Sequence, residues 1–193
     1  MLQESRRDRP TGIPAAVPGL LRRQWPALLA GSVLWFTAFA VGWANSGGDG
    51  HGAKRVHQQG DWSLFQEILV RNVGVSAALF LGVVTAGLLT IPLAFVTGML
   101  AGYSWGQGLD VLSGADVVRH LLPHMPLELA CIALSAGAGL VPMVMWARSG
   151  LGKSAGPRKG FGNGLGISDA CRLWGISLVG LVVAAGVETW VST

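Results

Sequence analysis

The residues best suited to chemistry lie just before a long apolar segment. His120, His124 and Glu128 follow one another at intervals of four, which would place them on one face of a continuous helix. A histidine near a carboxylate can act as a general acid and base, because the carboxylate moves the imidazole pKa across neutral pH. His124 and Glu128 are therefore the candidate catalytic residues. The sequence supplies no adjacent nucleophile, since Ser113 is remote and Cys131 lies deeper in the apolar segment.

The same three residues could instead bind a metal ion. A metal site needs three or four ligands and further residues that orient them. Pro123 and Pro126 interrupt the helix that would align the three side chains. No Cys-x-x-Cys motif or comparable ligand spacing occurs elsewhere in the sequence. The sequence therefore predicts no metal and no cofactor.

Composition identifies the class of protein that positions these residues. The chain has 193 residues, of which 51% are hydrophobic and 12% are charged, about half the charged fraction of a typical soluble domain. Its apolar residues form long runs without charge, which is typical of integral membrane proteins. The net charge of +4 comes from basic residues that flank these runs instead of forming one patch. The expected partner is thus the lipid bilayer, and no nucleic acid.

The apolar runs predict an all-α, polytopic membrane bundle with about five transmembrane helices. The predicted spans are residues 27–44, 73–89, 93–105, 126–146 and 173–191. The charge-free stretch from Val73 to Gly108 would be about 54 Å long as one helix, whereas a bilayer core measures roughly 30 Å. We therefore expect a break at Thr90-Ile91-Pro92. The third span is short, and whether it crosses fully stays open.

The other segments are expected outside the bilayer core. Residues 1–24 predict a flexible basic tail, followed by a single transmembrane domain over residues 25–193. A signal peptide is the competing interpretation of the first span, but its apolar run exceeds the usual core of about 7–15 residues. One or two interfacial helices are expected, within residues 56–72 and over residues 107–122, where apolar and polar residues alternate at near-helical spacing.

Small residues recur every four positions in the second and third spans. Such stripes allow membrane helices to approach closely. We therefore predict helix packing at Gly74 and Gly82 in the second span and at Gly98 and Gly102 in the third.

The distribution of positive charge predicts the orientation of the chain. Five spans place the amino terminus and residues 147–172 on one side, which carries ten Arg and Lys residues against four on the other. The amino terminus is therefore expected in the cytoplasm, with the chain a multi-pass protein of the bacterial cell membrane. This orientation brings three separate polar segments to the outer boundary. The expected cluster consists of Arg71, Asn72, Arg119, His120, His124, Glu128 and Glu188.

The cluster has a structural interpretation as well as a chemical one. Ionisable groups within a membrane are costly unless they are paired, hydrated or functional. Hydrogen bonds and ion pairs among these residues would join spans two, four and five, and this is the leading interpretation. Catalysis by His124 and Glu128 is the alternative, and on balance the sequence favours a protein that is not an enzyme.

Three features of the sequence occur together: Arg71-Asn72 before span two, the run Leu122-Pro123-His124-x-Pro126-x-Glu128-Leu129, and Glu188 in the last span. In these features the chain resembles the stage II sporulation protein M family. The resemblance covers Ile68 to Thr193. The chain departs from the family pattern at Thr97, where asparagine is usual, and at Met125, where glycine is usual. The resemblance implies a multi-spanning protein of the cytoplasmic membrane, in a family whose best-known members work with peptidoglycan-remodelling partners.

Three functions follow as expectations. The first is a scaffold or membrane partner in an envelope-associated complex. The second is a membrane subunit for export of, or immunity to, a peptide or a lipid-linked substrate. The third is a membrane-embedded enzyme that tailors a peptide through His124 and Glu128.

Overall fold

The computed structural model describes residues 16–47, 61–111, 114–151 and 166–191, and these ranges are almost entirely helical. The long helices are α1 (Ala16–Ala44), α2 (Trp62–Phe80), α3 (Thr90–Val111), α5 (Met125–Leu151) and α7 (Ile167–Trp190). A 3₁₀ turn (Leu81–Thr85) follows α2, and the short α4 (Gly114–Asp116) continues into a π-helical turn (Val117–Leu121). The predicted all-α membrane bundle is confirmed.

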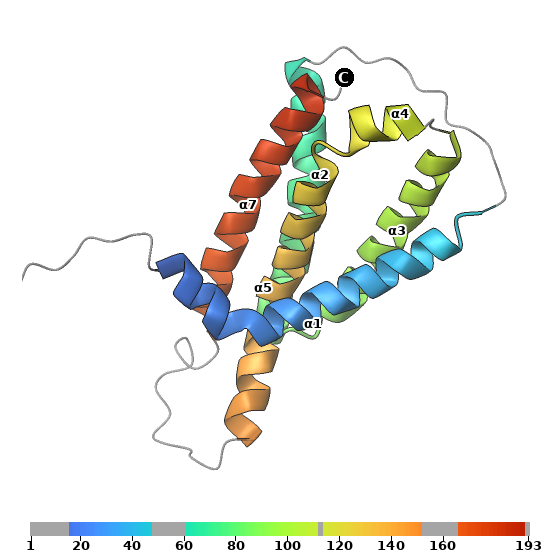
Figure 1. Cartoon of the computed structure of the whole chain (residues 1–193). Helices are drawn as coiled ribbons and strands as arrows, with labels where there is room; N and C mark the ends of the chain where they lie inside the picture. The colour runs from blue at the N-terminus through green and yellow to red at the C-terminus, as the bar shows by residue number, and fades with distance from the viewer. Residues whose placement is uncertain (1–15, 48–60, 112–113, 152–165, 192–193) are drawn as a thin grey trace, which may run out of the picture.

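The helices α2, α5 and α7 run side by side, while α1 crosses the bundle obliquely and packs against α3 and α5 (Figure 1). One end of the bundle carries the helix termini Trp62, Met125 and Trp190, and we call it the Trp190 end. The opposite end carries the α2–α3 turn, the start of α1 and the start of α7, and we call it the Arg23 end. Candidate site residues from both halves of the sequence lie at the Trp190 end.

Four of the described helical segments are long and apolar enough to cross a membrane. They are Val17–Ala44, Trp62–Thr85, Met125–Arg148 and Ile167–Trp190. The fifth predicted span, residues 93–105, lies inside α3. This helix has 22 residues, so it is about 33 Å long, but it is not among the four.

The break between the second and third spans lies earlier than predicted. The chain turns after the 3₁₀ segment, at Ala86 and Gly87, which have φ values of 52° and 94°. Gly87 adopts this left-handed conformation without a steric cost. Pro92 does not make the break; it lies in the first turn of α3, where its missing N–H would have no helical partner anyway. At the start of α3, the amide of Leu89 donates a hydrogen bond to the hydroxyl oxygen of Thr85 at 2.9 Å.

The predicted interfacial helix within residues 56–72 is not a separate element. The structure shows one continuous helix from Trp62 to Phe80. Asp61 caps it by accepting a hydrogen bond from the amide of Leu64 at 2.8 Å, and no proline interrupts it. In the second predicted surface segment, residues 107–122, α3 runs on to Val111, and α4 with the π turn lies across the Trp190 end (Figure 1).

The helix α1 also begins earlier than predicted. It starts at Ala16, so residues 16–24, assigned to the flexible tail, are helical. Pro18 falls in the first turn, which tolerates proline, and Leu20 and Gln24 are buried against the rest of the bundle. Tertiary contact therefore stabilises a segment whose composition indicates a tail. The remainder of that tail and residues 152–165 of the second polar loop lie outside the described residues.

The predicted glycine contacts differ from one position to the next. A Cβ at Gly98 or Gly102 would collide with the backbone of α1, at the carbonyl oxygens of Trp35 and Phe39 respectively. A Cβ at Gly82 would collide with Thr90 across the turn. Gly74 differs from its prediction, because nothing lies within 4 Å of the position its Cβ would take.

Three buried serines join α2, α5 and α7 in the middle of the bundle. The hydroxyls of Ser76 and Ser135 are 2.8 Å apart, and those of Ser135 and Ser177 are 2.7 Å apart. The indole N–H of Trp174 donates to Ser76 at 2.9 Å, and Ser177 donates to the carbonyl oxygen of Cys131 at 2.8 Å. One order of donation satisfies the whole chain: Trp174 to Ser76, Ser76 to Ser135, Ser135 to Ser177, and Ser177 to the carbonyl.

Replacing Ser135 by alanine is expected to destabilise the bundle by about 1–2 kcal/mol. The change interrupts the chain at its centre, and interhelical hydrogen bonds in membranes contribute on average about 0.6 and at most about 1.7 kcal/mol each. Reversible denaturation in mixed micelles measures the difference. Ser63→Ala, at an exposed position on α2, is the control, and an equal stability of the two variants would contradict a stabilising network.

Candidate functional site

A partly open cavity of about 500 Å³ lies between α1, α2, α3, α5 and α7. Its lining reaches from Ile68 on α2 and Met125 on α5 down to Trp35 on α1 and Ile132 on α5. Every long helix contributes at least one residue. The cavity therefore depends on the tertiary arrangement and belongs to no single segment.

The cavity lining contains polar and apolar side chains, and we call these two sets the polar wall and the apolar wall. The polar wall consists of Arg71, Asn72, His124, Glu128 and Glu188. The apolar wall is built chiefly from Trp35, Phe39, Val75, Leu100, Leu129 and Ile132. Because both kinds of surface face one space, the cavity fits an amphiphilic molecule better than a purely apolar or a purely polar one.

The polar wall is assembled at the start of α5. His124 is the last residue before this helix, and its carbonyl oxygen accepts the amide of Glu128 at 3.1 Å. Glu128 lies in the first turn, where the helix dipole favours a carboxylate. The side chain of Asn72, from α2, hydrogen-bonds Glu128, and the charge of Arg71 acts on the same carboxylate.

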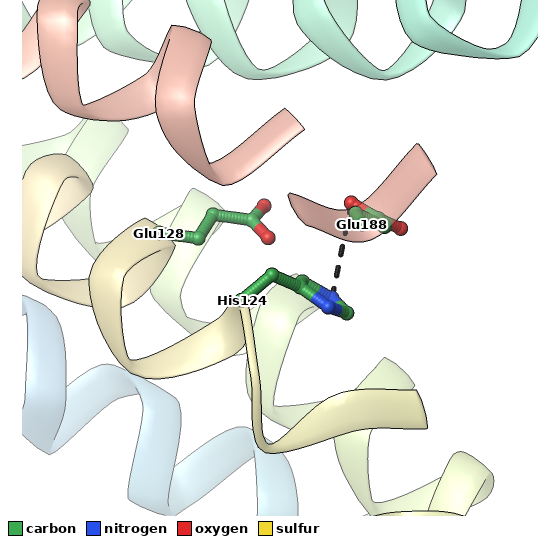
Figure 2. Close-up of side chains that lie close together, drawn as sticks. All are labelled: His124, Glu128 and Glu188. Atoms are coloured by element: carbon green, nitrogen blue, oxygen red, sulfur yellow. Dashed lines mark ion pairs between the residues drawn. The ribbon is translucent and has the colours of Figure 1, made fainter. Parts of the chain in front are cut away.

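Glu188 completes the group from the last turn of α7. Figure 2 shows Glu128 and His124 side by side on the α5 segment with Glu188 facing them. The end of α7 is held against the start of α2 by aromatic contacts: Trp190 stacks on Phe65 at a centroid distance of 5.2 Å and meets Trp62 edge to face at 5.3 Å. These contacts fix the height at which Glu188 enters the cavity.

The three side chains lie close together without a short bond between the histidine and Glu188. The distance from His124 Nε2 to Glu188 Oε2 is 3.8 Å, longer than the roughly 2.7–3.2 Å of a hydrogen bond to nitrogen. Burial lowers the pKa of His124 below its ordinary value, so its imidazole is neutral at pH 7. We therefore do not treat the contact with Glu188 as an ion pair at neutral pH.

The structure places most of the predicted cluster around this cavity. Arg71, Asn72, His124, Glu128 and Glu188 all line it. Arg119 is exposed and is not among the lining residues. The side chain of His120 lies outside the described part of the chain. Sequence reasoning missed the wall contributed by α1, because an apolar residue in a span carries no signal that it faces a cavity instead of lipid.

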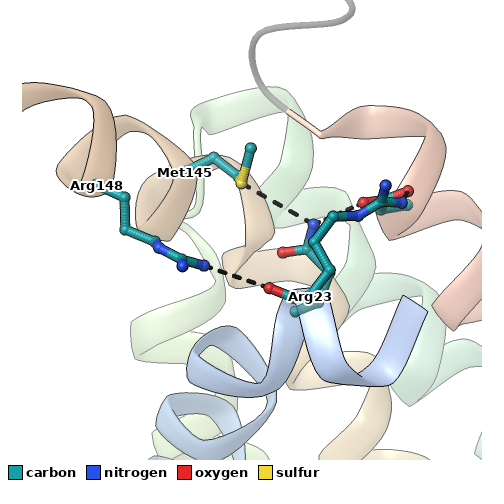
Figure 3. Close-up of polar contacts among 5 residues, drawn as sticks. Arg23, Met145 and Arg148 are labelled. Atoms are coloured by element: carbon teal, nitrogen blue, oxygen red, sulfur yellow. Dashed lines mark hydrogen bonds and ion pairs between the residues drawn. The ribbon is translucent and has the colours of Figure 1, made fainter. Parts of the chain in front are cut away.

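A second polar group at the Arg23 end was also missed. Asp169 is buried and accepts hydrogen bonds from Arg23 and from Gln24, the latter at 2.6 Å. Arg148 donates to the carbonyl oxygen of Arg23 at 3.3 Å, and Gln24 also contacts the sulfur of Met145 (Figure 3). The available signal was that Asp169 is the single acid among five basic residues in positions 147–172.

The helices and the cavity define a polytopic α-helical membrane protein with an amphiphilic site at one end. The chain belongs to the stage II sporulation protein M family, whose family model matches residues 28–193. The match includes all five polar residues of the cavity wall. No curated protein and no solved structure gives a significant match.

Proposed function

We propose that this protein is a membrane-embedded partner in an envelope-associated complex, and that its cavity holds an amphiphilic peptide or lipid-linked molecule for that complex. The observation that carries the proposal is the cavity itself, whose lining combines five polar residues with a larger set of apolar ones. A network that served only to join helices would pack its polar groups against each other and leave no such volume.

The proposal includes an orientation of the chain in the membrane. Arg22 and Arg23 lie near the start of α1, Arg172 lies near the start of α7, and Arg148 donates to the carbonyl oxygen of Arg23, so all four belong to the Arg23 end. Arg71 lines the cavity with Glu188, and Arg119 lies in the π-helical turn before α5. Basic residues favour the cytoplasmic side, so we place the amino terminus in the cytoplasm and the cavity toward the outer face of the cell membrane. Labelling of a single cysteine introduced at Trp190, from outside intact cells, tests this orientation; labelling only after lysis would contradict it.

Filling the cavity is expected to remove the bound amphiphile. Ala101, on α3, lines the cavity, and phenylalanine there would occupy much of the space beside the apolar wall. Native mass spectrometry of protein purified in mild detergent should show an amphiphile retained by the wild type and reduced at least about tenfold in Ala101→Phe, equivalent to about 1.4 kcal/mol of affinity. Ala130→Phe, at an exposed position on α5, is the matched control.

The outcomes separate the three functions considered from the sequence. Equal occupancy in all three proteins, or none in any, would overturn the proposed binding role. Recovery of protein partners by Ala101→Phe with loss of the amphiphile would assign assembly and binding to different surfaces. An enzyme using His124 and Glu128 would be indicated only if Glu128→Gln kept both the amphiphile and the partners and lost a modified product.

A further inference from the structure

We propose that His124, Glu128 and Glu188 bind a divalent metal ion at the polar wall of the cavity, and we use Zn²⁺ as the probe. This inference deepens the proposed function, on which its role rests, by assigning the group that would hold the polar end of the amphiphile. It changes the expectation drawn from sequence, because the third ligand comes from α7 and not from His120.

The first argument is the spacing of the possible ligand atoms. One atom from each of the three side chains lies within 4.8 Å of the other two, and the His124–Glu188 pair is at 3.8 Å. Zinc bonds to nitrogen and oxygen are about 2.0–2.2 Å long, which places two ligands of a tetrahedral ion about 3.4 Å apart. The possible ligand atoms are therefore close to the spacing that one ion requires, and the three side chains lie close together (Figure 2).

The second argument is the set of residues around these three. Carboxylate ligands of metal ions are themselves hydrogen-bonded by neighbouring residues that orient them. Asn72 hydrogen-bonds Glu128 from α2, so the carboxylate is held toward the group. Three protein ligands beside a cavity also leave a fourth coordination position for a water or a ligand, as in zinc sites that act on bound molecules.

The third argument is charge. The polar wall contains two carboxyl groups, and Arg71 supplies its one permanent positive charge. Charges in a membrane interior are costly when they are not balanced. A divalent ion would balance the charge of the two carboxylates, and Arg71 lines the same cavity. The ligand favoured there carries an anionic or strongly polarised oxygen, such as a carboxylate or a phosphate.

Metal uptake by the intact chain tests the inference directly. Full-length protein purified in mild detergent is stripped with a chelator, equilibrated with Zn²⁺ and analysed by inductively coupled plasma mass spectrometry. We expect one zinc ion per chain, and X-ray absorption should show one imidazole and oxygen ligands. A wild-type protein that retains no zinc, or whose zinc has sulfur ligands, would overturn the inference.

Variants assign the ion to this position. Glu188→Gln should weaken zinc binding by more than the roughly 10–100-fold that loss of an orienting neighbour costs, and Asn72→Ala should fall within that range. Glu67→Gln on α2 and Asn45→Ala after α1, both exposed, are the matched controls and should bind as the wild type does. Unchanged binding in Glu188→Gln, with an unaltered size-exclusion profile and helical content, would also overturn the inference.

The failure of this inference differs from the failure of the proposed function. If the wild type binds no zinc but retains an amphiphile, the metal site is wrong and the proposed binding role stands. If zinc binds and neither metal-loaded nor metal-free protein retains an amphiphile, the metal site stands and the proposed binding role is wrong. The X-ray absorption measurement decides the metal question without any variant, so a misfolded variant leaves the test intact.

Discussion

Replacing Gly102 by leucine is expected to prevent stable packing of α3 on α1, at a cost of more than about 3 kcal/mol. Overpacking costs about 1–3 kcal/mol where neighbouring side chains can move aside. Here a Cβ would collide with the backbone of α1, at the carbonyl oxygen of Phe39 and the amide nitrogen of Trp43. The helices can only separate, and α1 packs more extensively on α3 than on any other described helix.

A second glycine on the same helix provides the control. Gly108 has nothing within 4 Å of the position its Cβ would take, so Gly108→Leu adds the same side chain without a collision. Both changes raise helix propensity by a similar amount. The amount of folded monodisperse protein extracted from membranes should fall sharply for Gly102→Leu alone, and equal yields would show that the α1–α3 contact tolerates separation.

Replacing Arg23 by alanine is expected to destabilise the fold by about 2–4 kcal/mol. The variant leaves the buried carboxylate of Asp169 with the neutral amide of Gln24 as its described partner. Removing one member of a fully buried pair costs about 3–5 kcal/mol. The Arg23 side chain is 56% exposed, so solvent reduces that figure. The comparison of unfolding free energies in mixed micelles measures the loss.

A variant of the neighbouring arginine distinguishes loss of the Arg23–Asp169 contact from loss of positive charge at this end of the bundle. Arg22 is exposed on the same turn of α1, and Arg22→Ala removes the same positive charge from the same end of the bundle. We expect it to change stability by less than about 0.5 kcal/mol. The double variant Arg23→Ala/Asp169→Asn should regain part of the loss, because no unbalanced charge is then buried. A double variant less stable than Arg23→Ala would contradict the explanation.

The amino-acid sequence by itself determined the class of protein and the composition of its polar site. Long runs without charge predict membrane helices wherever they occur, because a bilayer core accepts few unpaired charges. The same rule made Arg71, Asn72, His124, Glu128 and Glu188 conspicuous, since costly residues at the ends of apolar runs stand out from their surroundings. The five are found around one cavity.

Local sequence was a weaker guide to helix boundaries. The alternation of apolar and polar residues within 56–72 indicated a separate surface helix, and Thr90-Ile91-Pro92 indicated a break. The structure has one continuous helix from Trp62 to Phe80, and the chain turns at Ala86 and Gly87. Contacts of α2 with α7 stabilise a continuous helix, and a proline in a first turn interrupts nothing.

Only the tertiary structure decided which residues share a site. Glu188 lies 60 residues beyond Glu128 in the sequence, and its carboxylate joins His124 because the last turn of α7 packs on the first turn of α2 through Trp190 and Phe65. The apolar wall from α1 and the serine chain through the bundle likewise join positions whose separation in sequence carries no information about distance. Side-chain type determines what a residue costs in a membrane, whereas the packing of whole helices determines which costly residues meet.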